Sequence, residues 1–78
     1  MASPSNAPNR AFSLGSSPGS FPTATDWLSF VNAGSGSVTI TTPGGDKIAL
    51  NLTTGMYPIR ATAITAVSSV SNIVGWWA

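Results

Sequence analysis

The sequence predicts a small all-β domain, a β-barrel or sandwich of approximately five strands, preceded by an extended N-terminal arm. Apolar and polar residues alternate over short stretches, and clusters of Gly, Pro, Asn and Ser separate these stretches. The chain has 78 residues, which is enough for one small domain. Because the composition changes near Asp26, we expect an arm over residues 1–25 and a β domain over residues 26–78.

The expected arm, residues 1–25, contains Pro4, Pro8, Pro18 and Pro22. Proline fixes φ and removes a backbone donor, so this stretch can form neither a helix nor a central strand. One interpretation is a disordered tail. The other is an arm that becomes ordered on a neighbouring subunit, because it carries apolar anchor residues that a solvated linker would lack. The candidate anchors are Phe12, Leu14 and Phe21.

The β domain begins with an expected strand at Trp27–Val31, rich in aromatic and β-branched residues, followed by a turn cluster at residues 32–36. Residues 38–52 then predict one β-hairpin around the turn Pro43–Asp46, where the glycines can adopt positive φ. One face of this hairpin is apolar and must cover a core. It is formed by Val38, Ile40, Ile48, Leu50 and Leu52.

Two further strands are expected at residues 58–66 and 73–77, with a loop or bulged turn at residues 68–72 between them. A helix over residues 61–74 is the alternative. Its threonines, valines and serines argue against it, because they lose χ1 freedom in a helix or compete for its backbone hydrogen bonds. Residues 61–78 carry no charge, which raises a membrane span as an alternative, but the serines and threonines make this stretch too polar for a helix in lipid.

The composition indicates association with other chains. Only 6% of residues are charged, the net charge is +1, and the chain has no Cys and no His. Disulfides and Cys/His zinc sites are therefore excluded as stabilisers, and a domain of this size seldom gains more than about 3–5 kcal/mol from its own core. Association of identical copies remains, and the nearly uncharged polar face of the hairpin suits close packing against another subunit.

Three tryptophans and one arginine complete the candidate interface residues. Strand alternation sends Trp76 and Trp77 to opposite faces, so that one can fill the core while the other stays exposed unless a partner covers it. The alternative is a small barrel that uses both, one of them at its open end. Trp27 begins the first strand, and Asp26 before it is expected either to act as a cap or to pair with Arg60. Tryptophan is enriched where interfaces carry their binding energy.

Residues that could carry catalysis are nearly absent. Asp26 and Asp46 are the only side-chain carboxylates, and there is neither a His base nor a Cys nucleophile. The Gly44–Gly45 pair lacks the GK[ST] ending of a phosphate loop. Three scattered cations form no basic patch, so we expect no nucleic-acid binding, and we also expect no enzyme activity, cofactor or metal.

The order of short motifs resembles one family. An Asp precedes the first strand, a hairpin carries Gly-Gly-Asp, Gly55-Met56-Tyr57-Pro58-Ile59-Arg60 follows, and the chain reaches Ile73-Val74-Gly75-Trp76-Trp77. This layout resembles the small head spike-base and capsid decoration proteins of tailed phages and gene-transfer agents over residues 26–78. The matching positions are Asp26, Val38, Ile40, Gly44, Gly45, Asp46, Ile48, Leu50, Pro58, Arg60, Ile73 and Trp77. Residues 68–71 depart from it, because Ser-Ser-Val-Ser replaces a Thr-Gly-Thr-Thr turn.

This resemblance implies a virion structural protein on the outer capsid surface, a homo-oligomeric head spike-base or fibre-anchoring protein. The implied partners are copies of the chain itself in a trimer or pentamer, the major capsid protein and a fibre protein, and Arg60 would lie at a subunit contact. One alternative is a capsid cement or decoration protein spread over the shell. Two others are a small membrane protein using residues 61–78 and a carbohydrate-binding module using Trp76 or Trp77.

Overall fold

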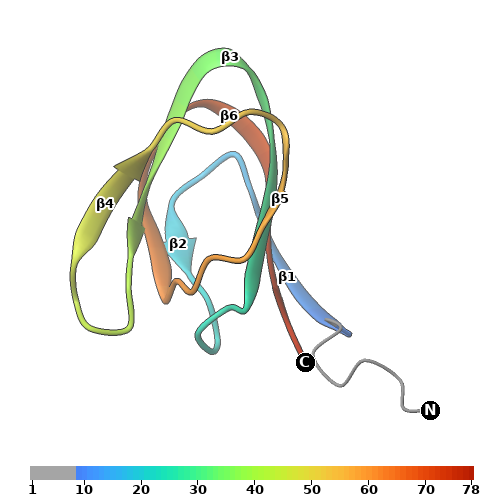
Figure 1. Cartoon of the computed structure of the whole chain (residues 1–78), viewed down its shortest axis with the longest axis vertical. Coiled ribbons are helices and arrows are strands. Elements are labelled where there is room, and N and C mark those ends of the chain that lie inside the picture. The colour runs from blue at the N-terminus through green and yellow to red at the C-terminus, as the bar shows by residue number, and fades with distance from the viewer. Residues whose placement is uncertain (1–8) are drawn as a thin grey trace.

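The structure is a computed structural model that describes residues 9–78 of the chain. These residues are all-β, as the sequence predicts, and form one antiparallel sheet of six strands with no helix among them. The strands are β1 (Arg10–Gly15), β2 (Gly19–Ser20), β3 (Trp27–Thr41), β4 (Lys47–Leu50), β5 (Gly55–Tyr57) and β6 (Ala63–Trp77). The sheet folds over on itself without closing into a barrel (Figure 1).

Strands β3 and β6 form the backbone of the fold, because each has 15 residues and the two pair along most of their length. Figure 1 shows both strands arching over at the top, so that the two halves of each run down opposite sides. The first half-sheet consists of β1, residues 73–77 of β6, residues 27–31 of β3, and β5. The second half-sheet consists of β2, residues 63–68 of β6, residues 37–41 of β3, and β4.

The core lies where the two half-sheets face each other. Leu28 and Ile73 contribute from the first half-sheet and Val38 and Ile64 from the second, all with almost no exposed surface. An aliphatic side chain removed from water contributes about 1.5–3 kcal/mol, which makes this set the main stabiliser of the fold. The buried apolar residues are Phe21, Leu28, Phe30, Val38, Ile40, Ala61, Ile64, Val70 and Ile73.

The cluster at residues 32–36, expected as a turn, instead forms the corner at which β3 bends. The register of β3 with β6 shifts between Asn32 and Ser37, and the facing part of β6, expected as a loop or bulged turn, has positive φ at Ser69 and Asn72. Bulges of this kind bend a strand and allow it to pass from one packed layer to the other. The turn prediction was wrong because Gly and Asn indicate only that the backbone can adopt unusual φ and ψ values. A bulge needs such values as much as a chain reversal does.

The buried side chain of Asn32 satisfies the backbone groups that the corner releases. Its Oδ1 accepts the N–H groups of Gly34 and Gly36 at 2.9 and 3.0 Å. Its Nδ2 donates to the carbonyls of Gly36 and Leu52 at 2.9 and 2.8 Å. A primary amide has two donors and two acceptor positions, so its whole capacity is used. Asn32 therefore replaces the ladder bonds that are lost where β3 bends.

The predicted hairpin is confirmed in its strands and turn. Val38 pairs with Leu50 and Ile40 with Ile48, and the N–H of Gly45, at φ 93°, donates to the carbonyl of Thr42 at 2.9 Å. The apolar face covers the core only in part, because Ile48 remains 44% exposed. The reason is its position on β4, which borders the second half-sheet and, within residues 9–78, pairs only with β3.

Residues 10–25 differ from the expected arm, because they belong to the sheet and the core. Strand β1 pairs with residues 73–77 of β6, and β2 pairs with its beginning. Phe21 and Thr25 are buried beside Gly75, where an added Cβ would lie 2.6 Å from both side chains. The expected boundary at Asp26 therefore divides no structural units. Pro18 and Pro22 are compatible with this because they flank the short edge strand β2. Pro4 and Pro8 belong to residues 1–8, which lie outside the described residues.

The stretch after the hairpin differs from the prediction in its boundaries. The strand expected at residues 58–66 begins only at Ala63, and it continues through the expected loop or bulged turn to Trp77. The alternative helix over residues 61–74 is therefore not observed. Among residues 9–78 no helix is long and apolar enough to cross a membrane.

Candidate interaction surface

The described part of the chain offers a surface rather than a cavity as its candidate site. No pocket is present in residues 9–78. The same residues hold no group of three or more His, Cys, Asp or Glu side chains that could bind a metal ion. The candidate site is therefore formed by side chains that remain on the surface although their chemistry favours burial.

The outer side of the first half-sheet is apolar and is not covered by any strand in residues 9–78. Cross-strand partners point to the same side of a sheet, and Trp27 pairs with Trp76 while Ser29 pairs with both Val74 and Met56. These positions alternate with Leu28, Phe30 and Gly75, which point into the core. The outer face, as we name it, is formed by Trp27, Val31, Met56, Val74 and Trp76.

The outer face is uncharged and partly exposed. Val31 and Met56 are each 42% exposed, and Trp27, Val74 and Trp76 are half-buried. The β1 residues on this side are Ala11 and Ser13, opposite Trp76 and Val74, so they add no charge. A contiguous uncharged apolar patch on one side of a sheet is typical of a protein-contact surface.

One of the two tryptophans of the outer face, Trp76, is held in place by a polar contact. Trp76 Nε1 donates to the Oγ of Ser29 at 2.8 Å, across the β3–β6 pair. Because the indole N–H of Trp76 is satisfied within the chain, this ring presents only its apolar surface outward. A partner that covers the ring therefore does not have to supply an acceptor for a buried indole donor. This arrangement suits an apolar partner surface.

The structure separates the three apolar candidates of the expected arm. Phe12 on β1 is 42% exposed and stacks edge-to-face on Phe21 at a centroid distance of 6.5 Å. Phe21 is only 7% exposed, so it is a core residue of its own chain and not an anchor for a neighbour. Leu14 is half-buried and closes the connection to β2, because its Cδ2 lies 2.8 Å from the point where Gly19 would carry a Cβ. Phe12 is therefore the accessible member.

The two final tryptophans take opposite sides of β6, as the alternation predicts. Trp76 lies on the outer face, and Trp77 shares the side of Gly75, opposite Arg10 of β1. Both are half-buried, so the expectation that one of them fills the core is wrong. Phe21 takes that place against Gly75, which sequence periodicity could not indicate because Phe21 precedes the first expected strand.

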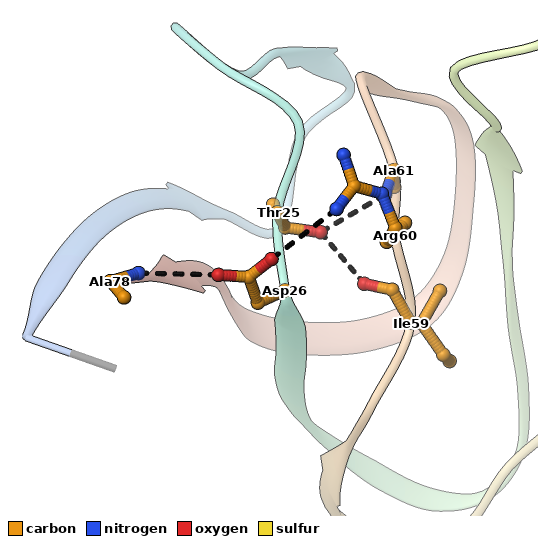
Figure 2. Close-up of polar contacts among 6 residues, drawn as sticks. All are labelled: Thr25, Asp26, Ile59, Arg60, Ala61 and Ala78. Carbon is orange, nitrogen blue, oxygen red and sulfur yellow. Dashed lines mark hydrogen bonds and ion pairs between the residues drawn. The ribbon is translucent and has the colours of Figure 1, made fainter. Parts of the chain in front are cut away.

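Asp26 joins the start of β3 to two other segments, and the expected pairing with Arg60 is confirmed (Figure 2). Its Oδ1 lies 3.5 Å from Nη1 of Arg60, and its Oδ2 accepts the N–H of Ala78 at 3.2 Å. The two side chains of the ion pair are 64% and 40% exposed, so the pair contributes about 0–1 kcal/mol. Its effect is to fix the connection before β6 beside the start of β3.

Thr25 is the buried part of the same junction, and no sequence pattern indicated its role. Its hydroxyl donates to the carbonyl of Ile59 at 2.8 Å and accepts the N–H of Ala61 at 3.0 Å (Figure 2). Its own N–H donates to the carbonyl of Ala61 at 3.0 Å. Thr25 lies between β2 and β3, where no strand period applies, so only the tertiary structure identifies it.

Other accessible apolar residues were missed as interface candidates. Val31 and Met56 complete the outer face, and Ile48 was assigned to the core side of the hairpin. The signal that could have identified Val31 is its alternation with Phe30, which places it opposite the core. Met56 lies between residue 52, where the predicted hairpin ends, and residue 58, where the next strand is expected, so its place on β5 was not apparent.

Comparisons with known proteins found no matching family, no similar curated protein and no similar solved structure. The fold and the outer face define a small β-domain with a surface suited to protein contact. The function is therefore inferred from this surface, together with the motif order of residues 26–78.

Proposed function

We propose that the protein is a virion structural protein, a homo-oligomeric head spike-base or fibre-anchoring protein on the outer surface of a phage-like capsid. The observation that carries the proposal is the uncharged outer face around Trp27 and Trp76, on a domain without a pocket in its described residues. The resemblance over residues 26–78 supplies the virion context. The proposed partners are copies of the chain, the major capsid protein and a fibre protein.

The chemistry of the outer face favours a protein partner. Tryptophan and methionine are enriched in protein–protein contacts, and Trp27, Trp76 and Met56 lie together on this face. A sugar would need several convergent polar groups beside an aromatic ring. Ser29 already accepts the indole N–H of Trp76, so the carbohydrate alternative has little support here. We assign the outer face to the contact with the major capsid protein.

Co-sedimentation with capsids tests the proposal. The capsids come from the phage or gene-transfer agent whose genome encodes the chain, and they are prepared without this protein. We expect the wild-type chain to sediment with them. The variant Val31→Ser/Met56→Ser should lose at least tenfold in affinity, because it makes the outer face polar while both positions are exposed in the free chain. Failure of the wild-type chain to bind would overturn the proposal.

A matched control has polar changes elsewhere on the surface. Thr65→Ser/Ala66→Ser changes two exposed residues of β6 in the second half-sheet, so it should bind capsids like the wild type. Particle images of the complex count the copies. Density confined to a few vertices supports a spike base, whereas density over the whole shell would favour the cement protein.

A further inference from the structure

We propose that copies of this chain join edge to edge, with β4 of one copy adding to β1 of the next, and that this contact repeats until a ring closes. The inference rests on the homo-oligomer of the proposed function and names its contact. Because two different edges of the chain meet, the contact is heterologous, which is the kind that generates rings.

The four edge strands of the two half-sheets differ in how readily they can pair with a strand of another chain. β2 has two residues and β5 has three, and Pro22 and Pro58 closely follow them. Very short strands and neighbouring prolines are features that keep an edge from pairing with another chain. β1 has six residues and β4 has four, and within residues 9–78 each pairs on one side only. They are the edges that can accept another strand.

Each of these two edges exposes one large apolar side chain on the same side of the sheet. Phe12 of β1 is 42% exposed and Ile48 of β4 is 44% exposed. Phe12 pairs with Gly75 and Ile48 with the buried Ile40, so both point toward the core side. An isolated chain leaves both side chains partly in water. Placing Phe12 of one copy opposite Ile48 of the next covers both of them.

The antiparallel register fixed by that contact brings no like charges together. With Phe12 opposite Ile48, Ser13 lies opposite Lys47, Ala11 opposite Ala49, and Arg10 opposite Leu50. The two cations therefore stand at opposite ends of the contact, and small side chains meet between them. Every strand pair within residues 9–78 is antiparallel, so this addition continues the sheet in its own pattern.

The positions of the two edges fit head-to-tail assembly. β4 lies on the left and β1 on the lower right in Figure 1, so the edges point to opposite sides of the molecule. Phe12 therefore contacts Ile48 of another copy rather than that of its own chain. A ring formed in this way leaves the outer faces free for the capsid contact proposed above.

Disulfide cross-linking tests the register, because the chain has no cysteine. Phe12→Cys and Ile48→Cys are made as single variants, mixed and oxidised. We expect a covalent dimer containing one copy of each, whereas neither single variant should cross-link alone. The double variant should give a ladder that ends at the ring size. Phe12→Cys mixed with Ala66→Cys, an exposed position on β6, serves as the control and should not cross-link.

Three results would overturn the edge contact. Cross-linking of Phe12→Cys alone would show β1 meeting β1. Absence of the mixed dimer in a protein that is oligomeric would place the contact on another surface. A wild-type protein that is monomeric in sedimentation velocity and on the capsid would leave no ring at all.

A charge series at Ser13 tests the direction of the strands. Ser13 is exposed, and Ser13→Glu and Ser13→Lys remove the same 3.3 Å bond from the N–H of Gly15, so their effects on monomer stability should match. Opposite Lys47, Glu should tighten and Lys should weaken the subunit contact, each by roughly two- to fivefold in dissociation constant. Ser13→Lys/Lys47→Glu should restore the wild-type value. Equal dissociation constants for Glu and Lys would overturn the antiparallel register.

The two proposals fail separately. Capsid co-sedimentation is measured on the wild-type chain and on the Phe12→Cys and Ile48→Cys variants, whose changed residues point to the core side and not to the outer face. An oligomeric protein that binds capsids but gives no mixed cross-link between Phe12→Cys and Ile48→Cys overturns the edge contact and retains the proposed function. A cross-linked ring that does not bind capsids retains the edge contact and overturns the proposed function.

Discussion

The two sides of β3 at residues 27–31 are both apolar, yet only one is covered. Leu28 and Phe30 point inward and are 0% and 3% exposed. Trp27 and Val31 point outward, where no strand of residues 9–78 covers them. Apolar content therefore does not decide which side becomes the core. The two half-sheets enclose only one core between them, so only one side of β3 can be buried in it and the other side stays uncovered.

The outer sides of the two half-sheets differ in polarity. On the second half-sheet the outward residues of the hairpin are Thr39, Thr41, Lys47 and Ala49, which water can solvate. The outward residues of the first half-sheet are largely apolar. The fold does not require this asymmetry, so we attribute it to a partner. Substitutions on the inner side should then change stability, and substitutions on the outer side should change assembly.

The largest expected effect comes from the inner side. Leu28→Ala removes a fully buried side chain between the half-sheets, and we expect a loss of about 2–5 kcal/mol in the free energy of unfolding. Val31→Ala, on the opposite side of the same strand, is the control and should lose well under about 1 kcal/mol. Denaturant unfolding followed by circular dichroism measures both. Equal losses would contradict the distinction between the two sides.

The corner that brings the inner sides together gives the next largest effect. A Cβ on Gly36 would lie 2.5 Å from the carbonyl oxygen of Ser69 and 2.6 Å from that of Ser68. Because backbone atoms of β6 cannot move aside easily, we expect Gly36→Ala to cost about 1–3 kcal/mol in the same assay. Gly44→Ala in the hairpin turn meets nothing closer than 3.9 Å and should be nearly neutral. A neutral Gly36→Ala would indicate that the corner can open.

The hairpin and the corner show how far the sequence predicts this fold. The hairpin was predicted because residues 38–52 contain its strands and its turn, so the interactions that specify it are local. The corner needs bulges in β3 and β6 to face each other, at residues 32–36 and 68–72. Neither segment shows this alone, and each resembles a turn. Long-range pairing therefore decided the structure where local propensity allowed two outcomes.

The candidate surface was predicted in part for the same reason. Trp27 and Trp76 were identified by residue type, and their direct pairing across β3 and β6 explains why they share a face. Phe21 was assigned to an interface because the proline-rich stretch indicated an arm. Its burial depends on the space above Gly75 on a distant strand, which no local pattern encodes.

On the outer side, the polar contact of Trp76 should matter less than its ring. Trp76→Phe keeps an aromatic surface but removes the 2.8 Å bond to Ser29, so we expect a stability loss of about 0.5–1.5 kcal/mol with capsid binding retained. Ser29→Ala should cost a similar amount, and the double variant should be less than additive because both changes break one bond. Additive losses would show that the bond contributes nothing. Trp76→Ala should abolish capsid binding.

The smallest effect is expected at Arg60, which belongs to neither side of β3. Arg60→Gln removes the 3.5 Å ion pair with Asp26, and because both side chains are substantially exposed the stability should fall by no more than about 1 kcal/mol. The difference from wild type should shrink between about 0.1 and 1 M salt, since the screening length falls from about 10 to 3 Å. Denaturant unfolding at both salt concentrations measures this, and a salt-independent loss would contradict it. If assembly weakens far more than stability, Arg60 acts at a subunit contact, as the family resemblance implies, and the surface used in assembly extends beyond the outer face and the two strand edges.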